Sequence, residues 1–264
     1  MFFGKVLAAI SRRLGRSGYE PVLLPADDDR ADLHARQPHL ARRFDATILI
    51  GVDNRAPVVH EVIEAELPCV GVDVHCDSPR AGYVGSDNFE GIRLGVRHLY
   101  ALGHRRIAHI AGAQNTVAGS ERLESFQSEA EVFDLDVPDD YIAVGDFSSG
   151  SGYREACALL ALSSPPSAIV VGSDLMALAA VRAVWEFGLQ PGRDVTIVGF
   201  DDLEAAALSH PPLTTIRQDR DALGELAADH VIELAEDPQA VPRTTLLPVE
   251  LVVRASSGAI QSAA

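Results

Sequence analysis

The sequence predicts an α/β fold in which parallel strands form a doubly wound sheet. Short runs of apolar and β-branched residues alternate with longer segments in which apolar residues recur every three or four positions. These are the patterns of buried strands and amphipathic helices. Strands and helices that alternate in this way are typical of parallel sheets with right-handed helical crossovers. The length of 264 residues lies where one hydrophobic core gives way to two.

The alternation can be followed along most of the chain. Strands are predicted at residues 46–52, 67–74, 82–87, 105–112, 141–147, 168–174 and 194–202. Helices are predicted at residues 2–18, 88–103, 120–135, 151–163, 174–188 and 219–235. In segment 88–103, for example, Ile92, Val96, Leu99 and Leu102 lie on one helical face.

The chain opens on a helix, although α/β proteins usually begin with a strand. The apolar face of segment 2–18 consists of Phe3, Val6, Leu7, Ile10 and Leu14. Gly15 and Gly18 close this helix. Segment 21–25, with the sequence PVLLP, is predicted to form a short buried strand.

The pattern breaks near residue 211. Pro211 and Pro212 end any helix there, and four extended residues follow at 213–216. A late strand is predicted at 244–254, with Pro248 inside it. A proline inside a strand cannot donate to the ladder, so this segment is expected at a sheet edge or at a crossing between lobes.

The charge of the chain argues against direct binding of nucleic acid. The chain has 38 acidic and 22 basic residues, which gives a formal charge of −16 at pH 7. Such a surface repels phosphate and gains little from counterion release, and its simplest consequence is solubility. No apolar run reaches the length of a membrane span and no basic-then-apolar leader is visible, so we expect no membrane association.

The cysteines give no sign of a metal site. Cys69, Cys76 and Cys157 make an odd number without metal-ligand spacing, and Cys69 lies in the apolar run LPCVGV. We expect buried free thiols in a reducing compartment.

The sequence contains no recognisable catalytic motif. Segment 150–155 imitates a dinucleotide fingerprint but has Glu155 in place of the third glycine, and segment 60–64 lacks the second histidine of a zinc-protease helix. There is no phosphate-binding loop and no G-x-S-x-G elbow. We therefore expect a protein that is not an enzyme and that has no cofactor and no metal.

Polar residues follow four predicted strands, at the edge where parallel sheets bind ligands. They are Asp73, Asp146 with Phe147, Ser173 with Asp174, and Asp201 with Asp202. Asp174 is expected to cap the helix that follows it, because a carboxylate accepts hydrogen bonds from the first turn. Asp201 is expected to face a ligand instead, because Asp202 is nearer the next helical segment and can cap it.

Five segments, in this order, resemble the effector-binding core of the LacI/GalR family of bacterial transcription regulators. They are 85–112, 145–160, 166–202, 211–219 and 246–256. The resemblance implies a two-lobed, periplasmic-binding-protein-like fold (type I) with three crossings, near Ser86–Asp87, Arg217–Gln218 and Pro248. The implied lobes are residues 1–86 plus 218–247, and residues 87–217 plus 248–264. In this family the ligand binds in the cleft between the lobes.

The resemblance also bears on the first residues of the chain. The aromatic pair Phe2 and Phe3 resembles the start of the family's first core helix. The chain is therefore expected to begin just past the first core strand and past the helix-turn-helix headpiece, and loss of that strand would expose a sheet edge. The family further implies a cytoplasmic homodimer that contacts operator DNA only through the headpiece.

The resemblance assigns ligand-binding roles residue by residue. Arg122 corresponds to an arginine that grips ligand polar groups with its planar fork, and its place near a helix start is otherwise unfavourable for a cation. Phe147 corresponds to an aromatic ring that stacks on the ligand, with core packing as the alternative. Asp201 and Asp73 correspond to carboxylates that accept from ligand hydroxyls. The remaining candidates are Ser173, where many members have asparagine, then Phe2 and Phe3 as a roof over the cleft, and Gln218 as a hinge or site residue.

These residue types suit a neutral polyhydroxylated ligand, so a sugar or sugar derivative is the first expectation. Purines and sugar phosphates stay open, although a phosphate would require more cationic groups than the site offers. Two other functions are compatible with this scaffold: a sugar-binding protein of a transport system, and an enzyme. The segments 102–112, 198–202 and 211–219 resemble the regulators more closely.

Overall fold

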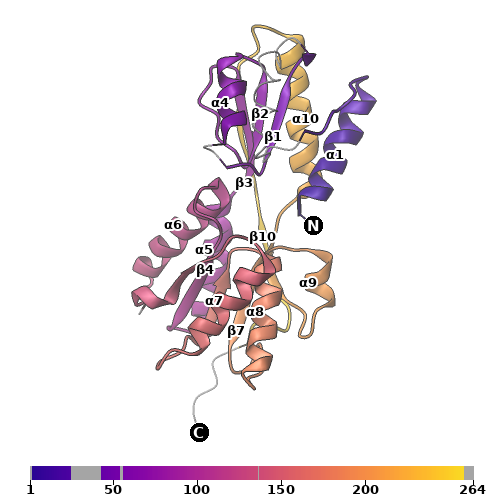
Figure 1. Cartoon of the computed structure of the whole chain (residues 1–264). Coiled ribbons are helices and arrows are strands. Elements are labelled where there is room, and N and C mark those ends of the chain that lie inside the picture. Colours follow the sequence, from indigo (N-terminus) through magenta and orange to yellow (C-terminus); the bar gives the residue numbers. More distant parts are fainter. Residues whose placement is uncertain (1, 25–42, 54–55, 136, 259–264) are drawn as a thin grey trace. The chain divides into compact units, whose positions relative to one another are not determined.

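The computed structural model describes residues 2–24, 43–53, 56–135 and 137–258 (Figure 1). The chain divides into two compact units. The first consists of Met1–Ser86, Asn115–Val117 and Asp219–Leu247, and the second of Asp87–Gln114, Ala118–Gln218 and Pro248–Ala264. Gln218, which was expected in the first lobe, belongs to the second unit. Each unit has its own sheet and its own apolar core.

The first unit contains a four-stranded parallel sheet with the order β1-β2-β3-β9. Its strands are β1 (Thr47–Ile50), β2 (Cys69–Val72), β3 (Ala81–Ser86) and β9 (Thr244–Leu247). Its helices are α1 (Phe2–Arg16), α4 (Pro57–Glu64) and α10 (Arg220–Glu236). Every residue of β2 is buried, as expected for a strand inside a parallel sheet.

Helix α1 packs against α10, as the adjacent ribbons of Figure 1 show. The residues of α1 that are buried are Val6, Ala9, Ile10 and Leu14. The predicted face was therefore partly wrong: Leu7 is only half-buried, and Phe3 is 38% exposed. The two helices approach most closely at Gly224, where an added Cβ would lie 2.5 Å from the carbonyl oxygen of Val6.

The strand predicted at 21–25 is wrong within its described residues, Pro21–Leu24. These residues have no regular structure, and Val22, Leu23 and Leu24 are 63%, 76% and 48% exposed. The four residues are apolar enough for a strand, but the sheet order of the described residues contains no partner that pairs with them. An apolar run becomes a strand only when another strand satisfies its backbone groups.

The second unit contains a six-stranded sheet with the order β10-β8-β7-β6-β4-β5. Its strands are β4 (Ile107–Ala111), β5 (Ile142–Val144), β6 (Ala168–Val171), β7 (Thr196–Asp201), β8 (Thr214–Arg217) and β10 (Glu250–Val252). Its helices are α5 (Asn88–Ala101), α6 (Val117–Val132), α7 (Ser149–Leu160), α8 (Asp174–Glu186) and α9 (Glu204–Leu208), with a 3₁₀ turn at Asp139–Tyr141. All pairs are parallel except β8 with β10. The predicted α/β class with mainly parallel sheets is confirmed.

The late strand predicted at 244–254 is two strands separated at Pro248. Strand β9 is the last strand of the first sheet, and β10 is the last strand of the second. Both are edge strands, which confirms the expectation drawn from the proline. The chain leaves one sheet and enters the other at the residue that cannot donate a ladder hydrogen bond.

The contact of α1 with α10 gives a first prediction. Replacing Gly224 by alanine would place a Cβ 2.5 Å from the Val6 carbonyl and 2.6 Å from the Cβ of Ala9. Because backbone atoms must move, we expect a loss of about 1–3 kcal/mol in the free energy of unfolding. Urea denaturation of the Gly224→Ala variant measures this loss.

Gly15→Ala is the matched control. It lies in α1 with no atom within 4 Å of an added Cβ, so helix propensity alone predicts a gain of about 0.5–1 kcal/mol. Equal effects of the two substitutions would contradict the packing described for α1 and α10.

Candidate functional site

The candidate site in the second unit is built at the carboxyl ends of its parallel strands. Gly112 follows β4, Phe147 follows β5, Ser173 follows β6, and Asp201 is the last residue of β7. Neighbouring parallel strands end on the same edge of a sheet, so the fold brings these residues of separate sequence segments to one edge. The structure therefore supports the part of the prediction that was based on strand ends.

Arg122 lies on α6 and is 3% exposed. Its Nε–H donates to the side-chain oxygen of Asn88 at 2.8 Å, and its Nη1 donates to the carbonyl of Gly172 at 2.6 Å. The guanidinium lies 3.6 Å from the ring centroid of Phe200, a cation–π contact. Arg122 thus joins α6 to the end of β6 and to the start of α5. Its predicted contact with a ligand stays a prediction.

The ring of Phe147 lies against the backbone of Gly112. A Cβ at Gly112 would come within 2.0 Å of the Phe147 ring, so only glycine admits the ring at this place. Phe147 is half-buried and packs against the core of the second unit. Core packing, one of the two roles that the sequence left open, is therefore present, and stacking on a ligand stays a prediction.

Asp201 ends β7 with a side chain that is held in place. It is 7% exposed, and its Oδ1 accepts a hydrogen bond of 2.7 Å from the side-chain amide of Gln218. Gln218 is itself buried, and its Oε1 has no hydrogen-bond partner among the described residues. Gln218 thus positions the Asp201 carboxylate, a role that the sequence did not predict.

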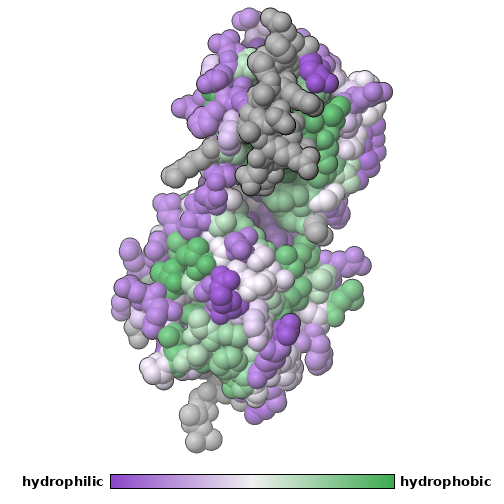
Figure 2. Space-filling model, viewed as in Figure 1, coloured by the Kyte–Doolittle hydropathy of each residue, from purple (hydrophilic) through white to green (hydrophobic). Residues whose placement is uncertain are grey.

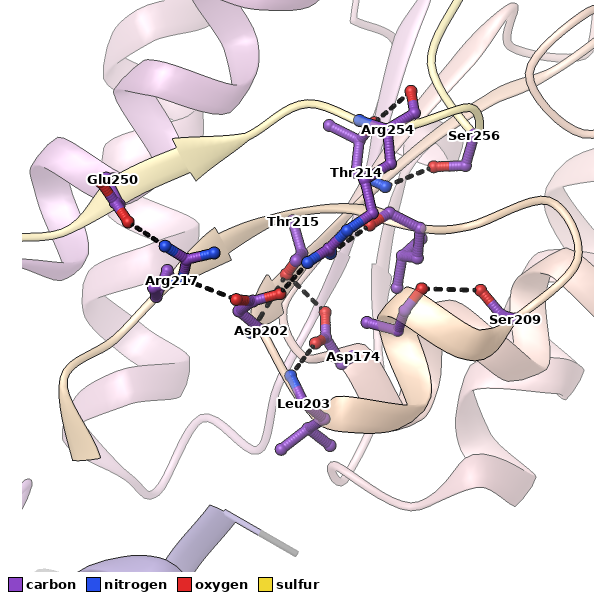
Figure 3. Close-up of polar contacts among 12 residues, drawn as sticks. Asp174, Asp202, Leu203, Ser209, Thr214, Thr215, Arg217, Glu250, Arg254 and Ser256 are labelled. Carbon is purple, nitrogen blue, oxygen red and sulfur yellow. Dashed lines mark hydrogen bonds and ion pairs between the residues drawn. The ribbon is translucent and has the colours of Figure 1, made fainter. Parts of the chain in front are cut away.

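Asp202 does not cap α9, which corrects the sequence prediction. Its two carboxylate oxygens accept from Arg217 and Arg254, each at 2.6 Å, and Arg217 also pairs with Glu250 (Figure 3). The adjacent cations hold the pKa of Asp202 below its usual value against the opposing effect of burial. Helix α9 begins without a side-chain cap.

Asp174 was predicted to cap α8, and this prediction is also wrong. The cap is Ser173, whose Oγ accepts from the backbone N–H of Met176 at 3.4 Å. Asp174 is fully buried and accepts instead from the backbone N–H of Leu203 at 2.7 Å and from the hydroxyl of Thr215 at 2.5 Å (Figure 3). Burial raises the pKa of Asp174 above its usual range, and the nearby Asp201 charge adds to the rise.

The first unit presents a comparable edge. Asp73 directly follows β2 and is 6% exposed, and Gly51 directly follows β1. The ring of Phe3 covers Gly51, where an added Cβ would lie 2.4 Å from the Phe3 ring, and Phe2 meets Phe3 edge to face at 5.1 Å. The aromatic pair therefore lies at the carboxyl end of β1, within the same unit as Asp73.

Three of the predicted site residues, together with Asp202, share an unusual backbone conformation. Asp73, Phe147, Asp201 and Asp202 have φ angles of +55°, +67°, +125° and +51°. Residues other than glycine avoid this region, and such strain persists where the surrounding structure enforces it, often at ligand sites. Three of the four residues were predicted ligand residues, and no sequence pattern indicated their backbone conformation.

Several polar residues that support this edge were not found from the sequence. Asn88 accepts from Arg122 and donates to Glu121 at 2.8 Å, and Arg217 and Arg254 hold Asp202. The two residues of each hydrogen bond are far apart in the sequence: 33 residues for Asn88 with Glu121 and 34 for Asn88 with Arg122. The separation from Asp202 is 15 residues for Arg217 and 52 for Arg254. No local motif could therefore reveal these contacts.

Within the described part of the chain, no group of three or more His, Cys, Asp or Glu residues is arranged to hold a metal ion. None of its helices is both long enough and apolar enough to cross a membrane.

Comparison with known proteins identifies the class of this fold and site. A family model described as a periplasmic binding protein-like domain matches residues 96–257. The lactose operon repressor of Escherichia coli (strain K12) is 33% identical over 253 residues, which cover 95% of this chain and 69% of the repressor. The fold is thus the two-lobed, periplasmic-binding-protein-like one.

Solved structures narrow the class to a family. The transcriptional regulator CelR in complex with cellobiose has a TM-score of 0.90 and 29% identity, covering 97% of this chain and 79% of that chain. The lac repressor dimer bound to operator and the anti-inducer ONPF has a TM-score of 0.83 and 32% identity. The match covers 97% of this chain and 89% of that chain. The chain belongs to the LacI/GalR family of transcription regulators and comprises the ligand-sensing core of that family.

The buried carboxyl of Asp174 gives a prediction about pH. Because its folded pKa is raised, the folded chain keeps a proton that the unfolded chain releases above a pKa of ~3.9. The proton kept by Asp174 therefore adds to the free energy of unfolding. This addition is complete at low pH and is lost as pH rises through the pKa that Asp174 has in the folded chain. A carboxyl with a raised pKa titrates between about pH 5.5 and 8, so the free energy of unfolding should decline over this range. We expect the decline to be smaller in Asp174→Asn, and urea denaturation at several pH values measures it.

Asp146→Asn is the control for this measurement. Hydrogen bonds from the side chain and backbone of Ser148 and from Ser151 lower the pKa of Asp146 to about 2, so its ionisation is complete throughout the window. The pH slope of this variant should equal that of the unchanged chain. A slope that Asp174→Asn leaves unaltered would refute the assignment of a raised pKa to Asp174.

Proposed function

We propose that the effector sensed by this core is a neutral sugar or sugar derivative, bound by Arg122, Phe147 and Asp201 of the second unit. The observation that supports this most strongly is the meeting of a cation, an aromatic ring and a carboxylate at one sheet edge. The ring is fixed by Gly112, and the carboxylate is fixed by Gln218. Because these side chains are already fixed, they lose little conformational entropy when a ligand binds.

The chemistry of the three groups suits a polyhydroxylated ligand. A carboxylate such as Asp201 accepts from vicinal hydroxyls, and an aromatic ring such as Phe147 covers the apolar face of a sugar ring. The planar fork of Arg122 donates to ring or hydroxyl oxygens. The cellobiose complex of the related regulator CelR supports this choice. Purines and sugar phosphates are the alternatives that a ligand panel must include.

Residues of the first unit and two supporting residues of the second are also proposed to contribute to effector binding. We assign Asp73 as a second acceptor for ligand hydroxyls and Phe2 and Phe3 as aromatic contacts. Ser173 is proposed to donate its hydroxyl to the ligand while its oxygen caps α8. Gln218 contributes by holding Asp201.

The mechanism that follows is a shift between populations of conformations. A sugar that binds one arrangement of the two units better than another favours that arrangement, and only this difference in affinity can do work. We propose that the shift changes how a dimer engages operator DNA through a helix-turn-helix headpiece. The charge of −16 on this chain supports a separate DNA-binding segment, and so does the dimer of the related lac repressor on its operator. The proposed place of action is the cytoplasm.

The proposed dimer surface includes exposed apolar side chains of the second unit. Leu175, Trp185, Phe187 and Leu208 are 46%, 44%, 44% and 78% exposed. Figure 2 shows hydrophobic residues exposed among hydrophilic ones on the surface of this unit. Covering exposed apolar side chains is favourable, and the dimer of the related lac repressor points to a second copy of this chain as the occupant.

The sugar proposal is tested by a ligand panel. Thermal-shift and calorimetric measurements should find a sugar that stabilises the chain, and Asp201→Asn should weaken its binding by about 10–100-fold, since a charged hydrogen bond is worth about 1.5–3 kcal/mol. Asn keeps the shape of the side chain. The sugar should be recovered unchanged after incubation, as expected for a sensor.

The exposed Asp140→Asn variant is the control and should bind as the unchanged chain does. Stabilisation by a purine or a sugar phosphate, with no response to neutral sugars, would contradict the proposed ligand class. Full binding by Asp201→Asn would contradict the proposed site.

The dimer proposal is tested separately by Leu208→Asp. Leu208 is 78% exposed, so the substitution should leave the fold intact, while a charge in an apolar interface is strongly unfavourable. Sedimentation velocity should find a dimer of the unchanged chain and a monomer of the variant. A monomeric unchanged chain, or a variant that dimerises equally well, would contradict the assignment of this surface.

A further inference from the structure

Two cysteines of the first unit lie next to each other. Cys69 is the first residue of β2, and Cys76 lies in the loop that joins β2 to β3. Their Sγ atoms are 4.0 Å apart. Since a disulfide bond is about 2.05 Å long, the two sulfurs must approach by only about 2 Å to form one.

The loop geometry that brings the thiols together is specific to the local sequence. After β2 the chain reverses at Asp73, whose φ is +55°, and Val74 then folds back over the strand. An added Cβ at Gly71 would lie 1.9 Å from the carbonyl oxygen of Val74, so this reversal requires glycine. The backbone is thereby directed so that residue 76 returns to the start of β2.

Hydrogen bonds hold the rest of the loop. The backbone N–H of Cys69 donates to the carbonyl of Arg80 at 3.0 Å, and that of Ser78 donates to the carbonyl of Cys76 at 3.0 Å. The guanidinium of Arg80 donates to the carbonyls of Leu234 and Pro238 at 2.5 and 2.9 Å. The two thiols therefore face each other in a loop whose backbone is held by hydrogen bonds.

The two thiols have different environments. Cys69 is completely buried in an apolar cluster with Leu49, Val59 and Val74, whereas Cys76 is half-buried. The hydrogen bond from Cys69 lowers the pKa of Cys76, and the same bond together with burial raises the pKa of Cys69. Cys76 is thus the thiol that both reaches solvent and forms the thiolate more readily.

We propose that Cys69 and Cys76 form a reversible disulfide when the protein meets hydrogen peroxide. Cys76 is the thiol that reacts with peroxide, and Cys69 is the thiol that resolves the product. The bond closes a ring of residues 69–76 that includes Asp73. Paired cysteines that are partly accessible in this way are typical of redox-responsive sites in reducing compartments.

The reaction balances with peroxide as the only co-reactant. The Cys76 thiolate attacks one peroxide oxygen, the O–O bond breaks, and the sulfur becomes a sulfenic acid while hydroxide takes a proton to give water. The Cys69 sulfur then attacks the Cys76 sulfur, the S–O bond breaks, and the leaving hydroxide takes the Cys69 proton to give a second water. Two thiols are oxidised and one peroxide is reduced. A dithiol reductant reverses the step by thiol–disulfide exchange.

The test uses the full chain with Cys157 replaced, so that only this pair of cysteines is present. Cys157→Ser protein is treated with hydrogen peroxide, unfolded, alkylated with N-ethylmaleimide and weighed by mass spectrometry. We expect both alkylation sites to be lost with a mass decrease of two hydrogens, and both to return after dithiothreitol. No effector is needed, so failure here is distinct from failure of the proposed function.

Two variants separate the roles of the pair. In Cys157→Ser/Cys69→Ser, Cys76 should be trapped by dimedone as a sulfenic acid. In Cys157→Ser/Cys76→Ser, Cys69 should stay fully alkylatable. Retention of both alkylation sites in peroxide-treated Cys157→Ser would overturn the proposal. So would a sulfinic acid on Cys76 with Cys69 unmodified, or a disulfide between two chains on a non-reducing gel.

Discussion

The sharp turn at the end of β7 is the constraint on which the candidate site depends. Asp201 and Asp202 both adopt positive φ there, a conformation that side chains disfavour. The turn is held because each carboxylate has a fixed partner: Gln218 for Asp201, and Arg217 with Arg254 for Asp202. The polar contacts shown in Figure 3 are therefore more than isolated ion pairs, because they also stabilise a strained backbone conformation.

The same support links distant parts of the second unit. Asp174 at the start of α8 binds the N–H of Leu203 just after the turn and the hydroxyl of Thr215 on β8. Arg254, in the last described segment, reaches Asp202 with 17% of its side chain exposed, so this pair is shielded from water more than a surface ion pair. Loss of Asp202 would remove the carboxylate partner of the shielded Arg254, which is the costly case. Interactions outside the carboxyl edge of the second sheet thus offset the backbone strain at that edge.

The first unit reaches a similar arrangement by packing instead. The rings of Phe2 and Phe3 and the reversal at Asp73 lie beyond strands whose glycines, Gly51 and Gly71, leave room for a close approach. Steric fit thus shapes this edge of the first sheet, as polar contacts support the corresponding edge of the second.

The sequence predicted the fold well because burial leaves a periodic trace. Strands β4, β6 and β7 are buried throughout and appear as apolar runs, and Pro248 marked the point at which the chain changes sheets. The failures have a common cause. Asp174 and Asp202 looked like helix caps because a cap is local, whereas their partners Thr215 and Arg254 lie 41 and 52 residues away.

Segment Pro21–Leu24 failed for a related reason. Its apolar residues fit a strand, but a strand needs a neighbour, and periodicity cannot supply one. In contrast, Phe147 and Asp201 were found from their places after strands, because the edge at which parallel strands end follows from topology alone. The positive φ of both residues required the structure.

Hydrogen exchange with and without a stabilising sugar tests the central claim most directly, namely that the carboxyl edge of the second sheet binds the effector. The account predicts that sugar slows exchange of backbone amides at residues 112–114, 145–148, 172–174 and 201–203. Protection confined to other parts of the second unit, with these four segments unchanged, would contradict it.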